Sequence, residues 1–287
     1  TYFLKGSYRG SLSACEQEIR KNYINQTLLG EKIAKELGCN LITLWLPDGS
    51  LYPGQIDLSN GWKNLNETLD EIFQKIDRGV RVLIEYKLFE PGTYSTLIPD
   101  WGSAYILAKK YSKNAGVLID MGHHSFGVNV EQIVARLLTE NMYCGFHFNT
   151  RYAVDDDHAV EPDAPMARIF YELVKGKVIC NDDENRNWAY MLDQCSGREN
   201  RIHAVLHSID SLQIVLAKAL LVDSNKLAKY QQKDEIILAN RTLNNALIHA
   251  DVRPIVAAAR LENNLTVDPI ASYIESGYQE KIETNRE

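Results

Sequence analysis

Acidic and histidine side chains follow four successive apolar segments of this sequence. They occur as Glu85-Tyr86-Lys87, Asp120-Met121-Gly122-His123-His124, His147-Phe148-Asn149 and Asp193-Gln194, with the run Asp155-Asp156-Asp157 soon after the third. Mixed carboxylate and imidazole ligands suit Mn²⁺, Zn²⁺, Co²⁺ or Mg²⁺. Burying a carboxylate without a partner costs on the order of several kcal/mol, so clustered carboxylates imply a cation between them. The pattern predicts a divalent-metal site if the four segments end at one place.

Strands separated by helices would bring those segment ends together. Nearly unbroken apolar runs predict strands at residues 40–46, 81–87, 115–120, 142–148 and 188–193. Helical spacing predicts helices at about 66–77, 101–111, 130–138 and 164–175 between them. Because such apolar strands are buried on both faces, they indicate a parallel sheet, whose ligand sites lie at the carboxyl ends of the strands. Five strands fit a doubly wound sheet or five-eighths of a barrel.

An earlier helix is predicted by a capping box, Ser13-x-x-Glu16. Leu29, Ile33 and Leu37 recur at every fourth position and mark its expected buried face. Gly38 is the expected stop signal.

The last third of the chain reads as helical. Patterns at 202–221, about 226–250 and 252–261 precede a polar tail at 275–287, expected to be exposed or to dock a partner. We therefore expect two parts, a partial barrel carrying the metal site (1–198) and a helical extension (199–287). The extension is expected to pack on the barrel and is a candidate oligomer interface.

Each site residue also has a plainer interpretation. A lone Glu or Asp at a strand end often caps a helix or faces solvent, and one of His123 and His124 is expected to be a simple loop residue. The Asp155–Asp157 run alone would be a solvated acidic turn, and Lys87 could form a salt bridge with Glu90. His203 and His207 have metal-competent spacing but lack the Glu of an H-E-x-x-H motif. The recurrence at four strand ends favours the metal site.

Composition excludes several classes of function. A net charge of −7 and a pI near 5.6 argue against nucleic acid or an anionic membrane as partner. No apolar run reaches the roughly 20 residues of a membrane helix. Five scattered cysteines without a C-x-x-C pair predict no disulfide framework, and we expect them to be small core residues of a reduced, cytoplasmic protein. Phosphate-loop, G-x-S-x-G and dinucleotide motifs are absent.

Several strings together resemble the L-rhamnose isomerase branch of the xylose-isomerase-like (β/α)₈ barrels, and more closely its bacterial broad-specificity subtype. They are GSLS (10–13), LWLPDGSLYPGQ (44–55), IEYKLFEP (84–91), YSTLIPDWG (94–102), LIDMGHH (118–124), IVARLL (133–138), GFHFN (145–149), DDD (155–157), MLDQ (191–194), ALLVD (219–223) and DPIASYIESGY (268–278). The resemblance covers essentially the whole chain. It implies an α/β fold, a (β/α)₈ TIM barrel of which the chain matches the last five β/α units, followed by C-terminal helices.

Carried over by position, the resemblance implies two metal ions at the site, with Mn²⁺ preferred. The first, structural ion would be held by Glu85, Asp120, His147 and Asp193. The second, catalytic ion would be held by His123, Asp155 and Asp157. Lys87 and Asp193 would be catalytic, and the substrate would contact Trp45, Lys87, His123 and Asp193.

The implied activity is aldose–ketose isomerisation, most directly of L-rhamnose to L-rhamnulose, in a homo-oligomer (dimer or tetramer). Two rivals remain: another metal-dependent TIM-barrel enzyme, such as a sugar epimerase or an AP-endonuclease-like phosphodiesterase, and a barrel fragment that binds metal without turnover. The family's first three β/α units and an early-strand histidine have no counterpart, and Thr150 stands where the family usually has Asp. The chain starts at Thr1 without a methionine, so we expect processing or a longer polypeptide, and full activity is expected to need the missing units.

Overall fold

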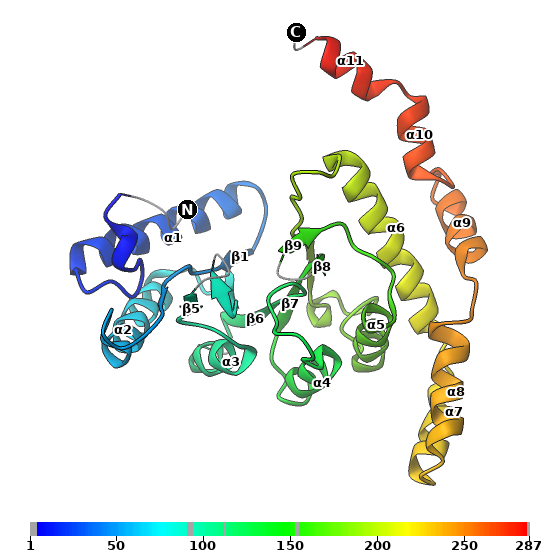
Figure 1. Cartoon of the computed structure of the whole chain (residues 1–287), viewed down its shortest axis with the longest axis horizontal. Coiled ribbons are helices and arrows are strands. Elements are labelled where there is room, and N and C mark those ends of the chain that lie inside the picture. Colours follow the sequence, from blue (N-terminus) through cyan, green and yellow to red (C-terminus); the bar gives the residue numbers. More distant parts are fainter. Residues whose placement is uncertain (1–4, 91–93, 112, 153–154, 286–287) are drawn as a thin grey trace. The chain divides into compact units, whose positions relative to one another are not determined.

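The computed structural model describes residues 5–90, 94–111, 113–152 and 155–285, the side chains of residues 155 and 156 excepted. Its helices are η1 (Ser7–Arg9), α1 (Gln17–Glu36), α2 (Leu58–Lys75), α3 (Trp101–Lys110), α4 (Val130–Thr139), α5 (Ala164–Gly176), η2 (Glu184–Arg186), α6 (Arg201–Leu220), α7 (Ser224–Gln232), α8 (Ile236–Leu247), α9 (Arg253–Glu262), α10 (Pro269–Glu275) and α11 (Tyr278–Thr284) (Figure 1). Its strands are β1 (Leu41–Leu44), β2 (Gly49–Ser50), β3 (Arg81–Glu85), β4 (Phe89–Glu90), β5 (Tyr94–Thr96), β6 (Ala115–Asp120), β7 (Cys144–Phe148), β8 (Thr150–Tyr152), β9 (Asp155–His158) and β10 (Ala189–Leu192).

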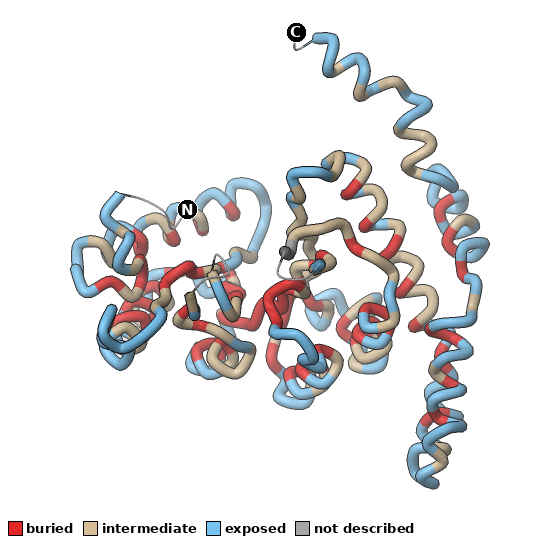
Figure 2. Tube along the Cα trace, viewed as in Figure 1, coloured by how far each residue is buried: buried red, intermediate tan, exposed pale blue. Residues whose placement is uncertain are grey.

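The five predicted strands form one sheet in the order β1-β3-β6-β7-β10. β1, β3, β6 and β7 pair in parallel, with Ile84 opposite Val117 and Asp120 opposite His147. Every residue of β6 is buried, and so is nearly all of β3 and β7 (Figure 2). The prediction of parallel strands covered on both faces is confirmed.

The chain divides into two compact units by its internal contacts. The first holds residues 1–128, 136–147 and 188–191, and the second holds residues 129–135, 148–187 and 192–287. Within the first, α1 packs against α2 and β1, and α3 packs against β3 and β6. Within the second, α5, α8, α9 and α10 each contact α6, and α7 packs on α8.

Short strands that the sequence did not signal build two smaller sheets. β2, β5 and β4 pair antiparallel, and β8 pairs antiparallel with β9. Each is two to four residues long, too short to show the alternation on which strand prediction depends.

The predicted buried face of α1 is wrong. Leu29, Ile33 and Leu37 are 55%, 52% and 80% exposed, whereas Tyr23 and Ala34 lie on the buried side. The neighbouring α2 and β1 pack on that other side, so the leucine and isoleucine positions face outward. Gly38 does follow the helix end, with φ of 73° in the left-handed region that glycine favours.

The predicted capping box is also wrong, because Ser13 has another partner. The Asp48 carboxylate, after β1, accepts hydrogen bonds from the Ser11 and Ser13 backbone N–H groups (2.8 and 3.0 Å) and from both hydroxyls (2.6 Å each). Asp48 is buried, as is Ser11. This network fastens the segment before α1 to the end of the first sheet strand.

Replacing Asp48 by asparagine should therefore lower the free energy of unfolding by about 2 kcal/mol, since the hydrogen bonds from Ser11 and Ser13 would lose their charged acceptor and an amide N–H₂ would replace the oxygen that accepts from the Ser11 hydroxyl. Denaturant unfolding measures the loss, and limited proteolysis before α1 locates it. Asp57→Asn is the matched control: the Asp57 carboxylate accepts from the Asn60 N–H as the cap of α2, a role asparagine fills equally well. Equal losses in the two variants would contradict the assignment.

The helical pattern predicted at about 226–250 needs correction. It forms two helices and not one, because Asp234 adopts φ of 55° and the chain turns between α7 and α8. The expectation that the cysteines are core residues also needs correction. Only Cys144 among the five unbridged cysteines is buried; the other four are exposed, since they lie in loops or near helix ends.

The polar tail at 275–287 contains α11 and is largely exposed over its described part.

No single described helix is long and apolar enough to span a membrane; α6 and α7 meet the length and composition criteria only together, as a pair bent by 60°.

Candidate metal centre

Three of the predicted metal ligands stand at the carboxyl ends of adjacent parallel strands. Glu85 ends β3, Asp120 ends β6, and His147 is the penultimate residue of β7. Asp120 is directly opposite His147, and Glu85 is opposite Leu118, two residues before Asp120. Because side chains alternate along a strand, the register places all three on one face of the sheet.

An apolar layer lies next to the ligands on the same face of the sheet. A Cβ at Gly145 would lie 2.5 Å from Leu83 and 3.1 Å from Leu118, so the layer below the ligands is already filled by leucines. Leu83 precedes Glu85 by two residues and Leu118 precedes Asp120 by two, on the same face. The leucine layer is the floor of the site.

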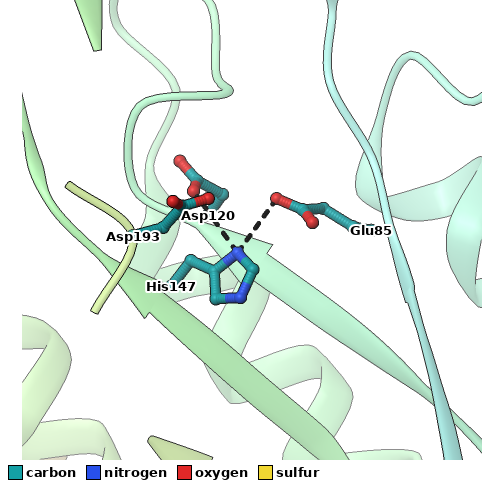
Figure 3. A group of neighbouring side chains, drawn as sticks. All are labelled: Glu85, Asp120, His147 and Asp193. Atoms are coloured by element: carbon teal, nitrogen blue, oxygen red, sulfur yellow. Dashed lines mark hydrogen bonds and ion pairs between the residues drawn. The ribbon is translucent and has the colours of Figure 1, made fainter. Parts of the chain in front are cut away.

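The ligand atoms converge closely enough for one cation. One oxygen each of Glu85, Asp120 and Asp193 and one ring nitrogen of His147 all lie within 4.8 Å of one another (Figure 3). His147 Nδ1 is 3.2 Å from Glu85 Oε1 and 3.8 Å from Asp120 Oδ2. Asp193 follows the last residue of β10, and its backbone N–H donates to the Phe148 carbonyl at 3.3 Å.

The charge of this cluster favours a divalent ion. Asp120 is fully buried and Glu85 is 4% exposed, so their carboxylates have little water to solvate them. Desolvating such charges costs several kcal/mol each by order of magnitude unless a cation or donors compensate. The Gly122 backbone N–H donates to Asp120 Oδ1 at 2.7 Å, which fixes one oxygen. Oxygen-rich ligation with one imidazole fits Mn²⁺, Mg²⁺, Co²⁺ or Zn²⁺, so the residues present fit the predicted metal.

His123 lies against the same carboxylates. Its Nδ1 is 3.0 Å from the Tyr86 carbonyl oxygen and 3.3 Å from Glu85 Oε1, and its Nε2 is 3.7 Å from Asp120 Oδ1. A carbonyl oxygen only accepts, so Nδ1 carries a proton, and in the neutral ring the lone pair is then on Nε2. Ligating histidines commonly donate their other N–H in this way, which fits the predicted role of His123.

The second predicted metal set is only partly described. Asp157 lies in β9 with φ of 65°, and its carbonyl accepts from the Cys195 N–H at 2.9 Å. Asp155 lies in the same strand, but its side chain is outside the described residues. The set of His123, Asp155 and Asp157 stays a prediction.

Two predicted substrate residues lie near one another, just after the carboxyl ends of β1 and β3. Lys87 Nζ is 5.9 Å from the centre of the Trp45 ring and 3.1 Å from Glu90 Oε2. Both members of this ion pair are largely buried, with side-chain exposures of 21% and 14%. The salt bridge to Glu90 that the sequence allowed for is present, and it restrains the ammonium group of Lys87, two residues after the end of β3.

Two residues to which the sequence assigned no role lie next to the predicted ligands in the chain. Tyr86, between Glu85 and Lys87, is fully buried, and burial together with the Asp120 charge raises its pKa well above the usual range. Its hydroxyl is 2.6 Å from His124 Nε2. The Glu-x-Lys spacing could have indicated the position of Tyr86, because alternation along a strand turns the middle residue to the opposite face from Glu85. His207, whose spacing from His203 is compatible with metal binding, lies outside this cluster: its Nε2 is 3.4 Å from Glu161 Oε1.

Comparison with solved structures shows a partial (β/α)₈ barrel. An L-ribulose 3-epimerase aligns with a TM-score of 0.55 at 12% identity, over 80% of this chain and 75% of that one. A D-tagatose 3-epimerase-like protein aligns with a TM-score of 0.52 at 19% identity, over 71% and 74% of the two chains. At these identities the similarity establishes the fold alone.

Comparison with protein sequences is more specific. The chain is 35% identical over 284 residues to a probable sugar isomerase of Rhizobium meliloti (strain 1021), and 34% identical over 285 residues to one of Mesorhizobium japonicum. These alignments cover 98% of this chain but only 65% and 66% of the two relatives. The family model described as L-rhamnose isomerase (RhaA) matches residues 5–245. The chain, with its carboxylate and imidazole cluster at the strand ends, therefore belongs to the L-rhamnose isomerase family.

Proposed function

We propose that the protein is a divalent-metal-dependent aldose–ketose isomerase that converts L-rhamnose to L-rhamnulose, with Mn²⁺ as its preferred ion and activity on other aldoses. The observation that carries the proposal is the convergence of Glu85, Asp120 and His147 at the carboxyl ends of adjacent parallel strands, with Lys87 following two residues after Glu85. This arrangement combines a cation site with a charged donor, the two features that moving a carbonyl between C1 and C2 of a sugar requires.

The ion held by Glu85, Asp120, His147 and Asp193 would supply Lewis-acid polarisation of the sugar carbonyl and stabilise the neighbouring alkoxide. A second ion, at His123, Asp155 and Asp157, is proposed on the resemblance. Asp193 is proposed, on the same ground, to contact the substrate and act in catalysis.

Lys87 would donate a hydrogen bond from its ammonium group to a substrate oxygen next to the reacting carbons, where negative charge develops. Its ion pair with Glu90 restricts the flexible side chain before the sugar arrives. Trp45, on the side of Lys87, would pack against the apolar face of the sugar ring.

The proposed assembly is a homodimer or homotetramer. The described helices of the second unit expose apolar side chains, among them Ile236 and Ile237 on α8 and Ile255 and Leu261 on α9. If these side chains gather into one apolar patch, the extension at 199–287 would be the interface. The unbridged cysteines fit a reducing, cytoplasmic location.

The test is a ketose-formation assay with L-rhamnose and Mn²⁺, together with elemental analysis of bound metal. Manganese-dependent ketose formation is the expected result. A C3-epimerised ketose formed from a ketose substrate, without any aldose conversion, would replace the isomerase with an epimerase. Bound metal without turnover would indicate that this chain needs the further length that its relatives have.

Lys87→Met should reduce turnover about 100-fold or more while leaving bound metal unchanged, because the ammonium donates to the substrate and lies outside the ligand set. Ketose formation and metal content are measured on the same sample. Lys63→Met is the control, since Lys63 forms an exposed pair with Glu67 on α2. Equal turnover in Lys87→Met and the unaltered protein would remove Lys87 from the mechanism.

A further inference from the structure

The face of the sheet opposite the metal centre carries a buried pair of polar rings. Tyr86 directly follows β3, so its side chain points away from the face on which Glu85 lies. Its hydroxyl is 2.6 Å from His124 Nε2, and the two rings meet edge-on with centroids 5.3 Å apart. Tyr86 is 1% and His124 8% exposed. The pair therefore forms in an environment that water scarcely reaches.

The same tyrosine contacts both neighbouring histidines, by different groups. Its backbone carbonyl accepts from His123 Nδ1 at 3.0 Å, and its side chain binds His124. His123 and His124 are consecutive, so fixing the second restricts the backbone from which the first projects. The Tyr86 hydroxyl and carbonyl thus hold the turn after β6 from two sides.

The other end of that turn is held by Asp120. Its Oδ1 accepts from the Gly122 N–H at 2.7 Å, and its backbone carbonyl accepts from the His123 N–H at 3.4 Å. The backbone from Asp120 to His124 is therefore restrained at both ends as long as the Tyr86–His124 hydrogen bond is formed. With Nδ1 donating to the Tyr86 carbonyl, Nε2 of His123 is directed toward Asp120, 3.7 Å away.

We propose that Tyr86 and His124 are positioning residues of the metal centre: their hydrogen bond on the far side of the sheet sets the orientation and tautomer of His123 on the near side. The inference rests on the proposed function, because it assigns His123 to metal ligation. Neither residue touches the metal or the sugar. Their effect reaches the site through the backbone of residues 122–124 and the carbonyl of Tyr86.

The alternative is that the pair only stabilises the fold of this unit, as other tyrosine hydroxyl bonds do. Tyr111, for example, donates its hydroxyl to Asp70 far along the chain from the ligands. A purely structural pair would change stability and leave the affinity for metal unaltered. Partners that orient a ligating histidine change metal affinity about 10- to 100-fold when removed.

The experiment measures Mn²⁺ affinity by isothermal titration calorimetry for the full 287-residue chain and for variants of the pair: Tyr86→Phe, His124→Leu, the double variant and His124→Gln. Tyr86→Phe and His124→Leu should each weaken Mn²⁺ binding about tenfold or more. The double variant should be no weaker than either single one, because both remove the same bond. His124→Gln, whose amide reaches the position of Nε2, should recover most of the affinity.

Tyr111→Phe is the matched control, and it should bind Mn²⁺ with unaltered affinity. Circular dichroism confirms that each variant is folded before titration. Unchanged affinity in folded Tyr86→Phe, or equal weakening in Tyr86→Phe and Tyr111→Phe, would overturn the inference. Independent, additive losses from Tyr86→Phe and His124→Leu would overturn it too.

A second measurement separates this inference from the proposed function. Long-range ¹H–¹⁵N NMR of histidine-labelled, metal-free protein reports which nitrogen of His123 carries the proton, the signal being assigned by its loss in His123→Gln. The unaltered protein should show the Nδ1–H tautomer, and Tyr86→Phe should show a mixture. If the unaltered chain bound no Mn²⁺, the proposed function would fail, and this tautomer change would still decide whether the pair positions His123.

Discussion

Replacing Asp120 by asparagine should abolish tight metal binding and, with it, ketose formation. Asp120 contributes one of the converging oxygens and is fully buried. Asparagine keeps an oxygen that can accept from the Gly122 N–H, so the turn after β6 is preserved. What the variant loses is one negative charge at the centre of the cluster, and an uncharged amide is a poor substitute for a carboxylate in binding a divalent ion.

The stability of this variant should scarcely respond to metal, whereas that of the unaltered protein should rise. With a chelator present, Asp120→Asn should be at least as stable, because one of three crowded carboxylates is gone. With Mn²⁺ at about 100 times its dissociation constant, the unaltered protein should gain about 2.7 kcal/mol and the variant almost nothing. Thermal unfolding with EDTA and with Mn²⁺ measures this difference in stability, and elemental analysis measures the bound metal.

Asp223→Asn is a suitable control for the loss of a carboxylate. Asp223 caps α7 by accepting from the Lys226 N–H at 2.9 Å, a role that asparagine keeps. It should retain the metal and the full Mn²⁺-dependent gain in stability. An unchanged metal content in Asp120→Asn would remove the centre described here.

Gly116→Ala should cause the largest loss of stability that a single methyl group can produce in this sheet, about 3 kcal/mol. A Cβ at this position would lie 2.4 Å from the Tyr143 carbonyl oxygen and 2.7 Å from Leu83 Cδ2. The carbonyl cannot move away freely, because it accepts from the Val117 N–H at 3.1 Å between β6 and β7. The strand that ends in Asp120 would therefore be forced away from its neighbour.

Gly30→Ala is the same substitution with the opposite expected effect on stability. Gly30 lies inside α1, and a Cβ there would have no neighbour within 4 Å. Its replacement should stabilise the protein by up to about 1 kcal/mol, since alanine is the better helix former. Denaturant unfolding of both variants checks the two signs. An unchanged free energy of unfolding in Gly116→Ala would contradict the prediction, because it would mean that β6 and β7 can move apart there without loss of stability.

The chemistry of the candidate site could be predicted from the sequence because strand ends are local features. Glu85, Asp120 and His147 each come at the end of an apolar run, and parallel strands bring their carboxyl ends to one edge. The apolar runs also predicted the five strands of the sheet. The resemblance added the family, which the matching family model confirmed, and the roles of the ligands, which stay predictions.

Contacts between distant segments could not be predicted in the same way. Ser13 and Glu16 form a valid capping pattern, yet Ser13 binds Asp48, 35 residues away, because a buried carboxylate must be satisfied by the donors that the fold places beside it. The exposed stripe of α1, formed by Leu29, Ile33 and Leu37, shows the same effect. Periodicity gives the candidate faces of a helix, and its neighbours decide which is buried.

The sequence by itself determined which residues end the parallel strands, which of them can ligate a metal, and the family to which they belong. Only the tertiary structure decided that Tyr86 binds both His123 and His124, and that Glu90 holds Lys87. The physical reason is the range of the interactions. Strand formation and side-chain alternation depend on neighbours in the chain, whereas hydrogen bonds between buried groups depend on which segments the packed sheet brings within about 3 Å.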